Sequence, residues 1–156
     1  MINEAAGTTA CILRRATAAD RPALAEIFLK ARRAAFLWQD TASFALDDFD
    51  AQTEGEVIVM AERTDGLALG FISVWEPDGF VHHLFVDPAH QGEGIGSLLL
   101  EDLDHWLPPP YRLKCLVRND PARAFYTRRG WHEVEGEAGR GGEGSADAWI
   151  LLEYGN

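Results

Sequence analysis

The sequence predicts an α+β fold in which helices cover both faces of a mixed, mostly antiparallel sheet of six to seven strands. Three observations lead to this prediction. An Asp65-Gly66 pair between two apolar runs is a strong hairpin signal, and the turn at 77–79 leads into a third strand. A glycine-rich turn at 91–97 then joins a strand to an apolar helix. Such a mixture of hairpins with one crossover favours an α+β sheet.

Each element is predicted from periodicity and from the residues that begin or end it. Thr17, with Asp20 three residues later, starts a helix, the prolines at 108–110 end another, and Pro121 and Gly130 bracket a third. In chain order we expect a strand at 11–16, a helix from 17 to 35, a helix at 41–53, strands at 57–61, 67–75 and 80–86, a helix from 95 to 107, a strand at 112–118, a helix from 121 to 129, and strands at 131–134 and 149–154.

Length, composition and charge place the chain in a broad class. Its 156 residues suit one domain, and we expect a mobile tail at 1–10 before a single domain at 11–156. The sequence has no run near the ~20 apolar residues of a membrane span and no secretory signal pattern, so a cytoplasmic protein without membrane contact is expected. A net charge of −11 argues against nucleic-acid binding. Cys11 and Cys115 lack partners at metal-ligand spacing, so we expect buried thiols and no metal.

The turn at 91–97, with the sequence Gln-Gly-Glu-Gly-Ile-Gly-Ser, is the most informative segment. Its glycines let the backbone approach a ligand closely, and the N–H groups of a helix's first turn favour an anion. A dinucleotide fingerprint would need its third glycine one residue later, and a P-loop would need a lysine that is absent from this turn. The turn therefore predicts a phosphate site of another kind; a turn without a ligand is the alternative.

A second segment strengthens this interpretation. The first motif reads Gln91-x-x-Gly94-x-Gly96, and about 25 residues later the second reads Asn-x-x-Ala-x-x-Phe-Tyr over 119–126, followed by Trp131. Together they resemble the acyl-coenzyme A site of the GCN5-related N-acetyltransferase (GNAT) superfamily, in which Phe usually stands where this chain has Trp131. The resemblance covers 69–131 well and the N-terminal third only in layout.

The resemblance implies acetyl-coenzyme A as co-substrate and a GNAT-like sheet. The backbone of Leu84 and Val86 would pair with the pantetheine arm as an added strand, the amides of 91–97 would hold the pyrophosphate, and the strands after Val86 and Arg112 would splay apart. Asn119 would bond to the coenzyme or cap the following helix. The residues expected at the coenzyme are Leu84, Phe85, Val86, Gln91, Gly92, Glu93, Gly94, Ile95, Gly96, Ser97, Asn119, Ala122, Phe125 and Tyr126.

The same resemblance implies transfer of an acetyl group to a primary amine by direct attack. Tyr126 is expected to give a proton to the departing thiolate, the alternative being a tyrosine that only packs against the sheet. A protonated amine needs a base, and His82 is the first candidate, with Glu76 and Asp87 in reserve. On a regular strand, positions 80, 82, 84 and 86 share one side, so His83 is expected on the other.

Acceptor specificity is expected from Phe36, Trp38 and Asp40, although an aromatic pair at a helix end often belongs to a core. The glycine-rich stretch 136–146 is expected to be a flexible connection that covers the acceptor or stays disordered. Glu93 stands where the family commonly has Arg or Lys, and it should weaken pyrophosphate binding unless its side chain points to solvent. A non-catalytic acyl-coenzyme A binding or sensing module is the alternative function, and a homodimer is compatible with the sequence.

Overall fold

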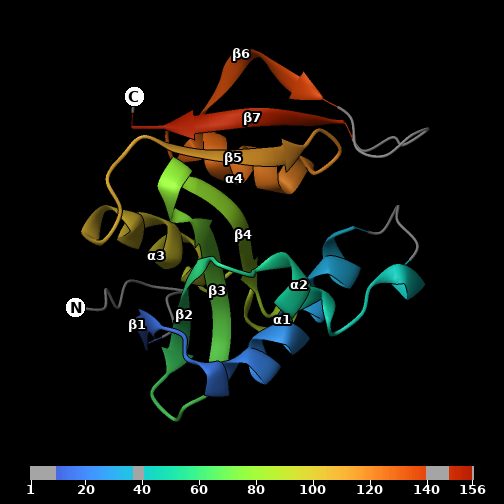
Figure 1. Ribbon diagram of the computed structural model, residues 1–156, viewed down its shortest axis with the longest axis vertical. Coiled ribbons are helices and arrows are strands. Elements are labelled where there is room, and N and C mark those ends of the chain that lie inside the picture. The colour runs from blue at the N-terminus through green and yellow to red at the C-terminus, as the bar shows by residue number, and fades with distance from the viewer. Residues whose placement is uncertain (1–9, 37–40, 140–147, 156) are drawn as a thin grey trace.

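The computed structural model describes residues 10–36, 41–139 and 148–155, apart from the side chains of 41, 137 and 138. Seven strands form one sheet in the order β1-β2-β3-β4-β5-β7-β6, and only β4 and β5 pair in parallel (Figure 1). Within these segments, no helix is long and apolar enough to span a bilayer. The strands are β1 (Cys11–Arg15), β2 (Val57–Arg63), β3 (Ala68–Trp75), β4 (Phe80–Val86), β5 (Tyr111–Leu116), β6 (His132–Gly139) and β7 (Trp149–Tyr154).

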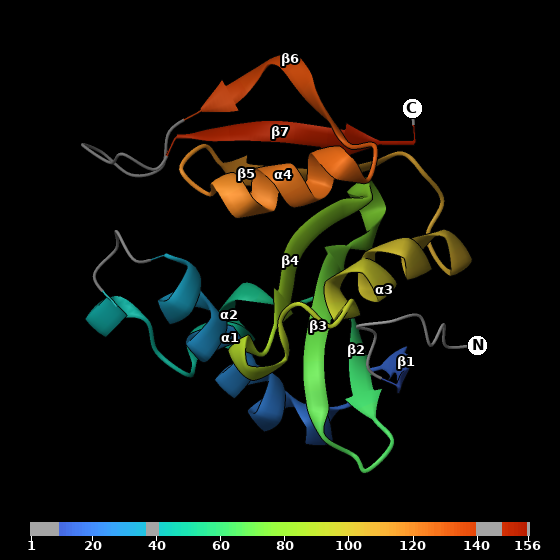
Figure 2. The same cartoon turned by 180° about the vertical axis from the view of Figure 1, so that it is seen from behind.

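Helices cover both faces of the sheet, which confirms the predicted fold class. Helices α1 (Arg21–Ala35) and α2 (Asp48–Gln52) lie on one face, and α3 (Ile95–Glu101) and α4 (Asp120–Arg128) lie on the other (Figures 1 and 2). Each face therefore has its own apolar core. The α1 side buries Leu24, Ile27, Phe28, Phe49, Ile58, Met60 and Phe71, whereas the α3 side includes Ile72, Val74, Val81, Ile95, Leu99 and Leu103.

Several element boundaries differ from the prediction by a few residues, and three elements differ more. The helix expected at 41–53 is a 3-10 turn (Thr41–Ser43) followed by the short α2, because the Asp48 carboxylate accepts the N–H of Ala45 at 2.9 Å and so competes with helical pairing. The helix after the glycine turn becomes a 3-10 helix at Asp102–His105. Strand β6 extends to Gly139, so part of the expected flexible connection is a strand; residues 140–146 lie outside the described chain, as does most of the predicted tail.

Strands β4 and β5 separate soon after they begin, as the resemblance implies. They pair only at Phe80 and Arg112, next to a hydrogen bond from the Arg112 N–H to the Gly79 carbonyl at 3.0 Å. Beyond this point, the edge of β4 that faces β5 has no strand against it. The sheet therefore contains an opening lined by backbone groups.

A β-bulge interrupts β4 at the two histidines. Ser73 of β3 pairs with His83, but the next residue, Val74, pairs with Val81, so His82 is the extra residue. The bulge cancels the alternation of side chains, and the two imidazole rings stack with centroids 3.9 Å apart. The expectation that His83 would point away from His82 is therefore wrong: both rings lie together, while Leu84 and Val86 pack toward the α3 side.

Candidate active site

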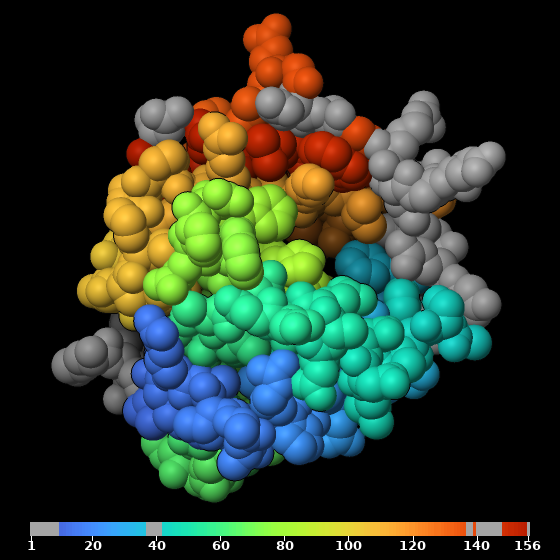
Figure 3. Space-filling view, in the orientation of Figure 1, coloured from blue at the N-terminus to red at the C-terminus, as the bar shows by residue number. Residues whose placement is uncertain are grey.

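A cleft of about 740 Å³ opens where β4 and β5 diverge. The last turns of α1, the end of β4, the glycine turn and one face of α4 line it, and Figure 3 shows the molecule hollowed between the blue and teal α1–α2 region and the orange β5–α4 region. All the residues expected at the coenzyme line this cleft, except Glu93. The two sequence motifs, although separated along the chain, thus contribute to one site.

The exposed edge of β4 offers backbone hydrogen-bonding groups to this cleft. The N–H of Asp87 donates to the Leu69 carbonyl at 2.8 Å, which assigns the odd-numbered residues of this stretch to pairing with β3. Because bonding direction alternates along an antiparallel strand, the N–H and C=O groups of Leu84 and Val86 face the opening. The Gln91 side chain donates to the Val86 carbonyl at 3.3 Å. An extended chain laid along β4 can therefore add a strand at this edge.

The glycine turn presents its backbone to the same cleft. Gly92 and Gly94 have φ angles of 84° and 83°, a left-handed conformation that favours glycine, and Gly94 is the N-cap of α3. The first N–H groups of the helix have no partner within it, so they can bind an anion. At Gly96 a Cβ atom would lie 3.6 Å from the Phe125 ring, so α3 and α4 meet closely. These features fit a phosphate-binding turn.

The Glu93 side chain lies beside the turn and not in the cleft. Its Oε1 atom is 3.4 Å from Nδ1 of His90, and its charge helps to raise the pKa of Arg63, after the larger effect of the Asp65 hydrogen bond. Only the backbone of Glu93 is therefore placed to meet a pyrophosphate. The sequence had raised the opposite concern, that a carboxylate would stand against the phosphates.

Two arginines that the sequence analysis did not assign line the cleft, namely Arg118 and Arg129. The Arg129 guanidinium donates through Nε to Ser97 Oγ at 3.1 Å, through Nη1 to the Phe125 carbonyl at 3.0 Å, and stacks 3.8 Å from the Phe125 ring centroid. It thus ties the first turn of α3 to α4. Arg129 lies four residues after Phe125, at the end of a predicted helix, so the sequence spacing could have indicated that the two side chains share one helix face.

Helix α4 presents Ala122, Phe125 and Tyr126 to the cleft. Asn119 caps the helix, because its side-chain oxygen accepts the N–H of Ala122 at 3.3 Å. Tyr126 packs on Trp131 with ring centroids 5.6 Å apart, and burial raises the pKa of its phenol above the ordinary value. The tyrosine therefore both packs and lines the cleft, and it keeps its proton at neutral pH.

The candidate base lies in a small polar cluster beside the bulge. His82 Nδ1 is 2.7 Å from Oε2 of Glu56, whose Oε1 accepts a hydrogen bond from the Ser73 hydroxyl. His83 beneath it is buried, with Phe28 at 4.8 Å between ring centroids, and burial lowers its pKa to about 3, with a smaller contribution from His82. His82 itself is not among the residues that line the coenzyme cleft.

Glu56, His82 and His83 place one potential metal-ligand atom each within 4.8 Å of one another. A metal bound by both imidazoles must lie near both ring planes, at bonds of about 2 Å. Planes of rings stacked at 3.9 Å and inclined by 29° intersect well beyond that distance. The cluster therefore fits a hydrogen-bonded relay and does not fit a metal centre.

The remaining candidates have other partners. Phe36 packs against Phe44 and Phe85, each with centroids 6.4 Å apart, while Trp38 and Asp40 lie outside the described residues. The Asp87 carboxylate accepts the N–H of Ala89 at 2.9 Å and pairs with Lys30 at 3.4 Å, and the exposed Glu76 borders a different hollow. On the α1 side, the cleft is lined by Ala31, Ala34 and Ala35.

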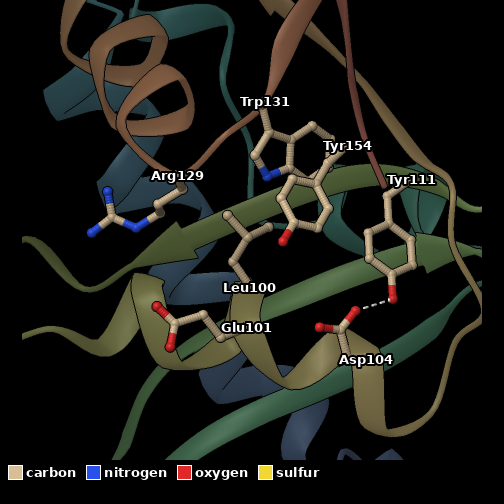
Figure 4. Close-up of a pocket in the computed structure, with 7 residues that line it drawn as sticks. All are labelled: Leu100, Glu101, Asp104, Tyr111, Arg129, Trp131 and Tyr154. Atoms are coloured by element: carbon tan, nitrogen blue, oxygen red, sulfur yellow. Dashed lines mark hydrogen bonds between the residues drawn. The ribbon is translucent and has the colours of Figure 1, made fainter. Parts of the chain in front are cut away.

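A smaller pocket of about 290 Å³, whose lining residues are drawn in Figure 4, shares Arg129 with this cleft. In it the Tyr111 hydroxyl donates to Asp104 at 2.6 Å. Arg129 lines both hollows, so its side chain stands between them. The smaller pocket is also lined by Leu100, Glu101, Trp131 and Tyr154.

Comparisons with known proteins agree with this arrangement. A profile of the acetyltransferase (GNAT) family matches residues 21–131. The chain is 28% identical over 130 residues to the peptidyl-lysine N-acetyltransferase YiaC of Escherichia coli K12, covering 80% of this chain and 85% of that protein.

Solved structures share the fold. YjaB from Escherichia coli superposes with a TM-score of 0.77 at 18% identity, covering 94% of this chain and 98% of that one. The PaiA N-acetyltransferase of Thermoplasma acidophilum, in complex with coenzyme A, superposes with a TM-score of 0.74 at 15% identity, covering 93% and 98%. The matched profile spans most of the chain, and the protein therefore belongs to the acetyltransferase (GNAT) family and is an N-acetyltransferase.

Proposed function

We propose that this enzyme transfers the acetyl group of acetyl-coenzyme A by direct attack of a primary amine, and that the amine is a lysine side chain of a protein. One observation carries the proposal: a single cleft joins the open edge of β4, the glycine turn and Tyr126. An extended thioester arm and its pyrophosphate need these three features in this order.

The coenzyme is bound mainly by backbone groups. Leu84 and Val86 pair with the peptide-like pantetheine arm, and the pyrophosphate lies on the amides of 91–97. Binding the arm displaces the Gln91 amide from the Val86 carbonyl, which it now caps at 3.3 Å. Arg118 and Arg129 add the positive charge that the turn itself lacks.

The reaction is a direct acyl transfer with three proton transfers. His82 accepts a proton from the ammonium group, directly or through water, and the neutral nitrogen attacks the thioester carbonyl carbon. The new C–N bond forms as the C–S bond breaks, and the nitrogen releases its second proton to solvent as the amide forms. Tyr126 then gives its phenolic proton to the thiolate of coenzyme A and recovers a proton from solvent. Burial raises the pKa of the Tyr126 phenol, so the phenol carries its proton at neutral pH when the substrates bind.

The choice of lysine rests on similarity to YiaC, which is a peptidyl-lysine N-acetyltransferase. The excess of acidic side chains, with a net charge of −11, suits a cationic acceptor. Phe36 remains a proposed contact of the acceptor. Trp38 and Asp40 are also proposed as acceptor contacts, from the sequence alone. The test described next also includes other amines as possible acceptors.

The test has two stages. Isothermal titration with acetyl-coenzyme A must show binding, and its absence at millimolar ligand would refute the proposal. A thiol-release assay then compares a lysine peptide blocked at its N-terminus, peptides with a free α-amine, and polyamines. Turnover with the lysine peptide supports the proposal, turnover only with another amine overturns the lysine assignment, and binding without thiol release for any amine favours a sensing module.

A further inference from the structure

We propose that Glu56 is a positioning residue for catalysis, which fixes the tautomer and orientation of His82 through the short contact at the bulge. This inference rests on the proposed function, because it needs His82 as the base. It adds a residue that neither the sequence motifs nor the coenzyme cleft identifies.

Both carboxylate oxygens of Glu56 are used. Oε2 lies 2.7 Å from His82 Nδ1, and Oε1 accepts the hydroxyl of Ser73, which is fully buried. The Glu56 side chain is only 7% exposed, whereas that of His82 is 38% exposed. A carboxylate from the residue just before β2 is thus held fixed beneath an accessible imidazole on β4.

The contact determines which ring nitrogen carries the proton. An ionised carboxylate can only accept hydrogen bonds, so Nδ1 of His82 must be the donor. In neutral histidine the other nitrogen, Nε2, then carries the lone pair. The opposite tautomer would leave Nδ1 and the carboxylate facing each other as two acceptors. Glu56 therefore keeps the solvent-accessible imidazole ready to accept a proton at Nε2.

Stacking on His83 holds the plane of the ring. His83 is 8% exposed and packs edge-on against Phe28, while its 3.9 Å contact with His82 covers one face of the outer ring. His83 cannot serve as the accessible base in the same way, since burial lowers its pKa to about 3 and its Nε2 is buried. The bulge thus creates one rigid support and one reactive ring from two adjacent histidines.

Replacing Glu56 by Gln tests the proposal in the full enzyme with the lysine peptide. The amide can donate to Nδ1 and so favours the wrong tautomer, and we expect kcat to fall by about 10- to 100-fold with KM for both substrates nearly unchanged. Glu62→Gln is the matched control, because Glu62 is also on the β2 side of the sheet but pairs with Arg14. Its kcat should stay within about two-fold of the wild type.

Two further measurements separate positioning from a structural effect. In a His82→Gln background, Glu56→Gln should cause no additional loss of kcat, whereas multiplicative losses would show that Glu56 does not act through His82. With a peptide α-amine, whose pKa of about 8 is far below the 10.4 of lysine, the defect of Glu56→Gln should shrink as pH rises toward 9. A defect that is equal for both amines at every pH would overturn the proposal.

An independent measurement uses the free protein. The ¹⁵N chemical shifts of His82 should show the Nδ1–H tautomer in the wild type and loss of that preference in Glu56→Gln. If the tautomer is as expected but no amine is acetylated, the proposed function fails and the pairing stands; an Nε2–H tautomer in the wild type overturns the pairing itself. Should Glu56→Gln fold poorly, Ser73→Ala removes one hydrogen bond from Glu56 and must produce the same changes in smaller degree.

Discussion

Acidification should destabilise this protein well above the pH at which its carboxylates are protonated, because of His83. Burial is the main reason that its pKa falls to about 3, and the neighbouring His82 and then Arg32 lower it further, while a backbone hydrogen bond to Gln52 acts in the opposite direction. The Glu56 carboxylate faces the outer ring of the same stack. The folded protein therefore holds His83 neutral at every pH above about 3.

The magnitude follows from the difference between the two states. In the unfolded chain this histidine titrates near its ordinary value of 6.5. Between pH 6.5 and 3 the unfolded state binds the proton and the folded state does not, so the free energy of unfolding falls as pH falls. At about 1.4 kcal/mol for each pH unit below 6.5, the loss at pH 5 is about 2 kcal/mol. Above pH 7 the titration of His83 no longer lowers the free energy of unfolding, and below pH 3 the loss that it causes stays constant.

Urea denaturation followed by circular dichroism at pH 7.5, 6.5, 5.5 and 5.0 measures this loss. His83→Phe is the control, because phenylalanine suits the aromatic contacts with Phe28 and Phe85 and does not titrate. The wild type should lose about 2 kcal/mol more than the variant between pH 7.5 and 5.0. Equal losses in the two proteins would refute the assignment of a buried, neutral His83.

Three further predictions concern the coenzyme cleft. Tyr126→Phe should lower kcat by about 10- to 100-fold and leave the Kd of acetyl-coenzyme A unchanged, and an unchanged kcat would remove Tyr126 from the acid role. Asn119→Ala should lower the free energy of unfolding by about 1 kcal/mol through loss of the helix cap, while Asn119→Asp keeps it, as thermal denaturation can check. Arg129→Ala should weaken coenzyme binding about 10-fold and more than Arg129→Lys does, since only arginine can bridge Ser97 and a phosphate; equal calorimetric Kd values for the two variants would contradict this.

Local signals explain what the sequence could predict. The hairpin at Asp65-Gly66 and the cap at Asn119 each act within a few residues, and the described structure has a turn and a helix start at those places. The expected stop at the prolines 108–110 is too late, because α3 ends at Glu101 and the following 3-10 helix at His105. The two motifs that resemble a coenzyme site could also be located in the sequence, because the turn at 91–97 and the helix at 120–128 each present their cleft-lining residues from one continuous segment.

The relations that the sequence could not predict join residues far apart. The bulge depends on how β3 pairs with β4, and nothing within the two histidines themselves indicates an extra residue there. The contacts of Glu56 with His82 and of Arg129 with Ser97 connect positions 26 and 32 residues apart. Where the helix expected at 41–53 is broken, the Asp48 carboxylate binds both the Ala45 N–H and the distant Arg32. Periodicity measures the average character of a segment and does not detect such individual bonds.

A net charge of −11 would be expected to repel a polyanionic co-substrate, but the groups that line the cleft act at shorter range. Repulsion from distant carboxylates is screened beyond about 10 Å, whereas backbone amides, Arg118 and Arg129 act at contact distance within the cleft. The one carboxylate of the turn, Glu93, is directed toward His90 and Arg63. Net charge therefore affects how molecules approach this protein from a distance. Binding of the coenzyme depends instead on how the backbone amides, the two arginines and Glu93 are oriented around the glycine turn. An acidic surface around a locally cationic cleft would attract an ammonium-bearing acceptor without excluding the coenzyme, which is the combination that an N-acetyltransferase requires.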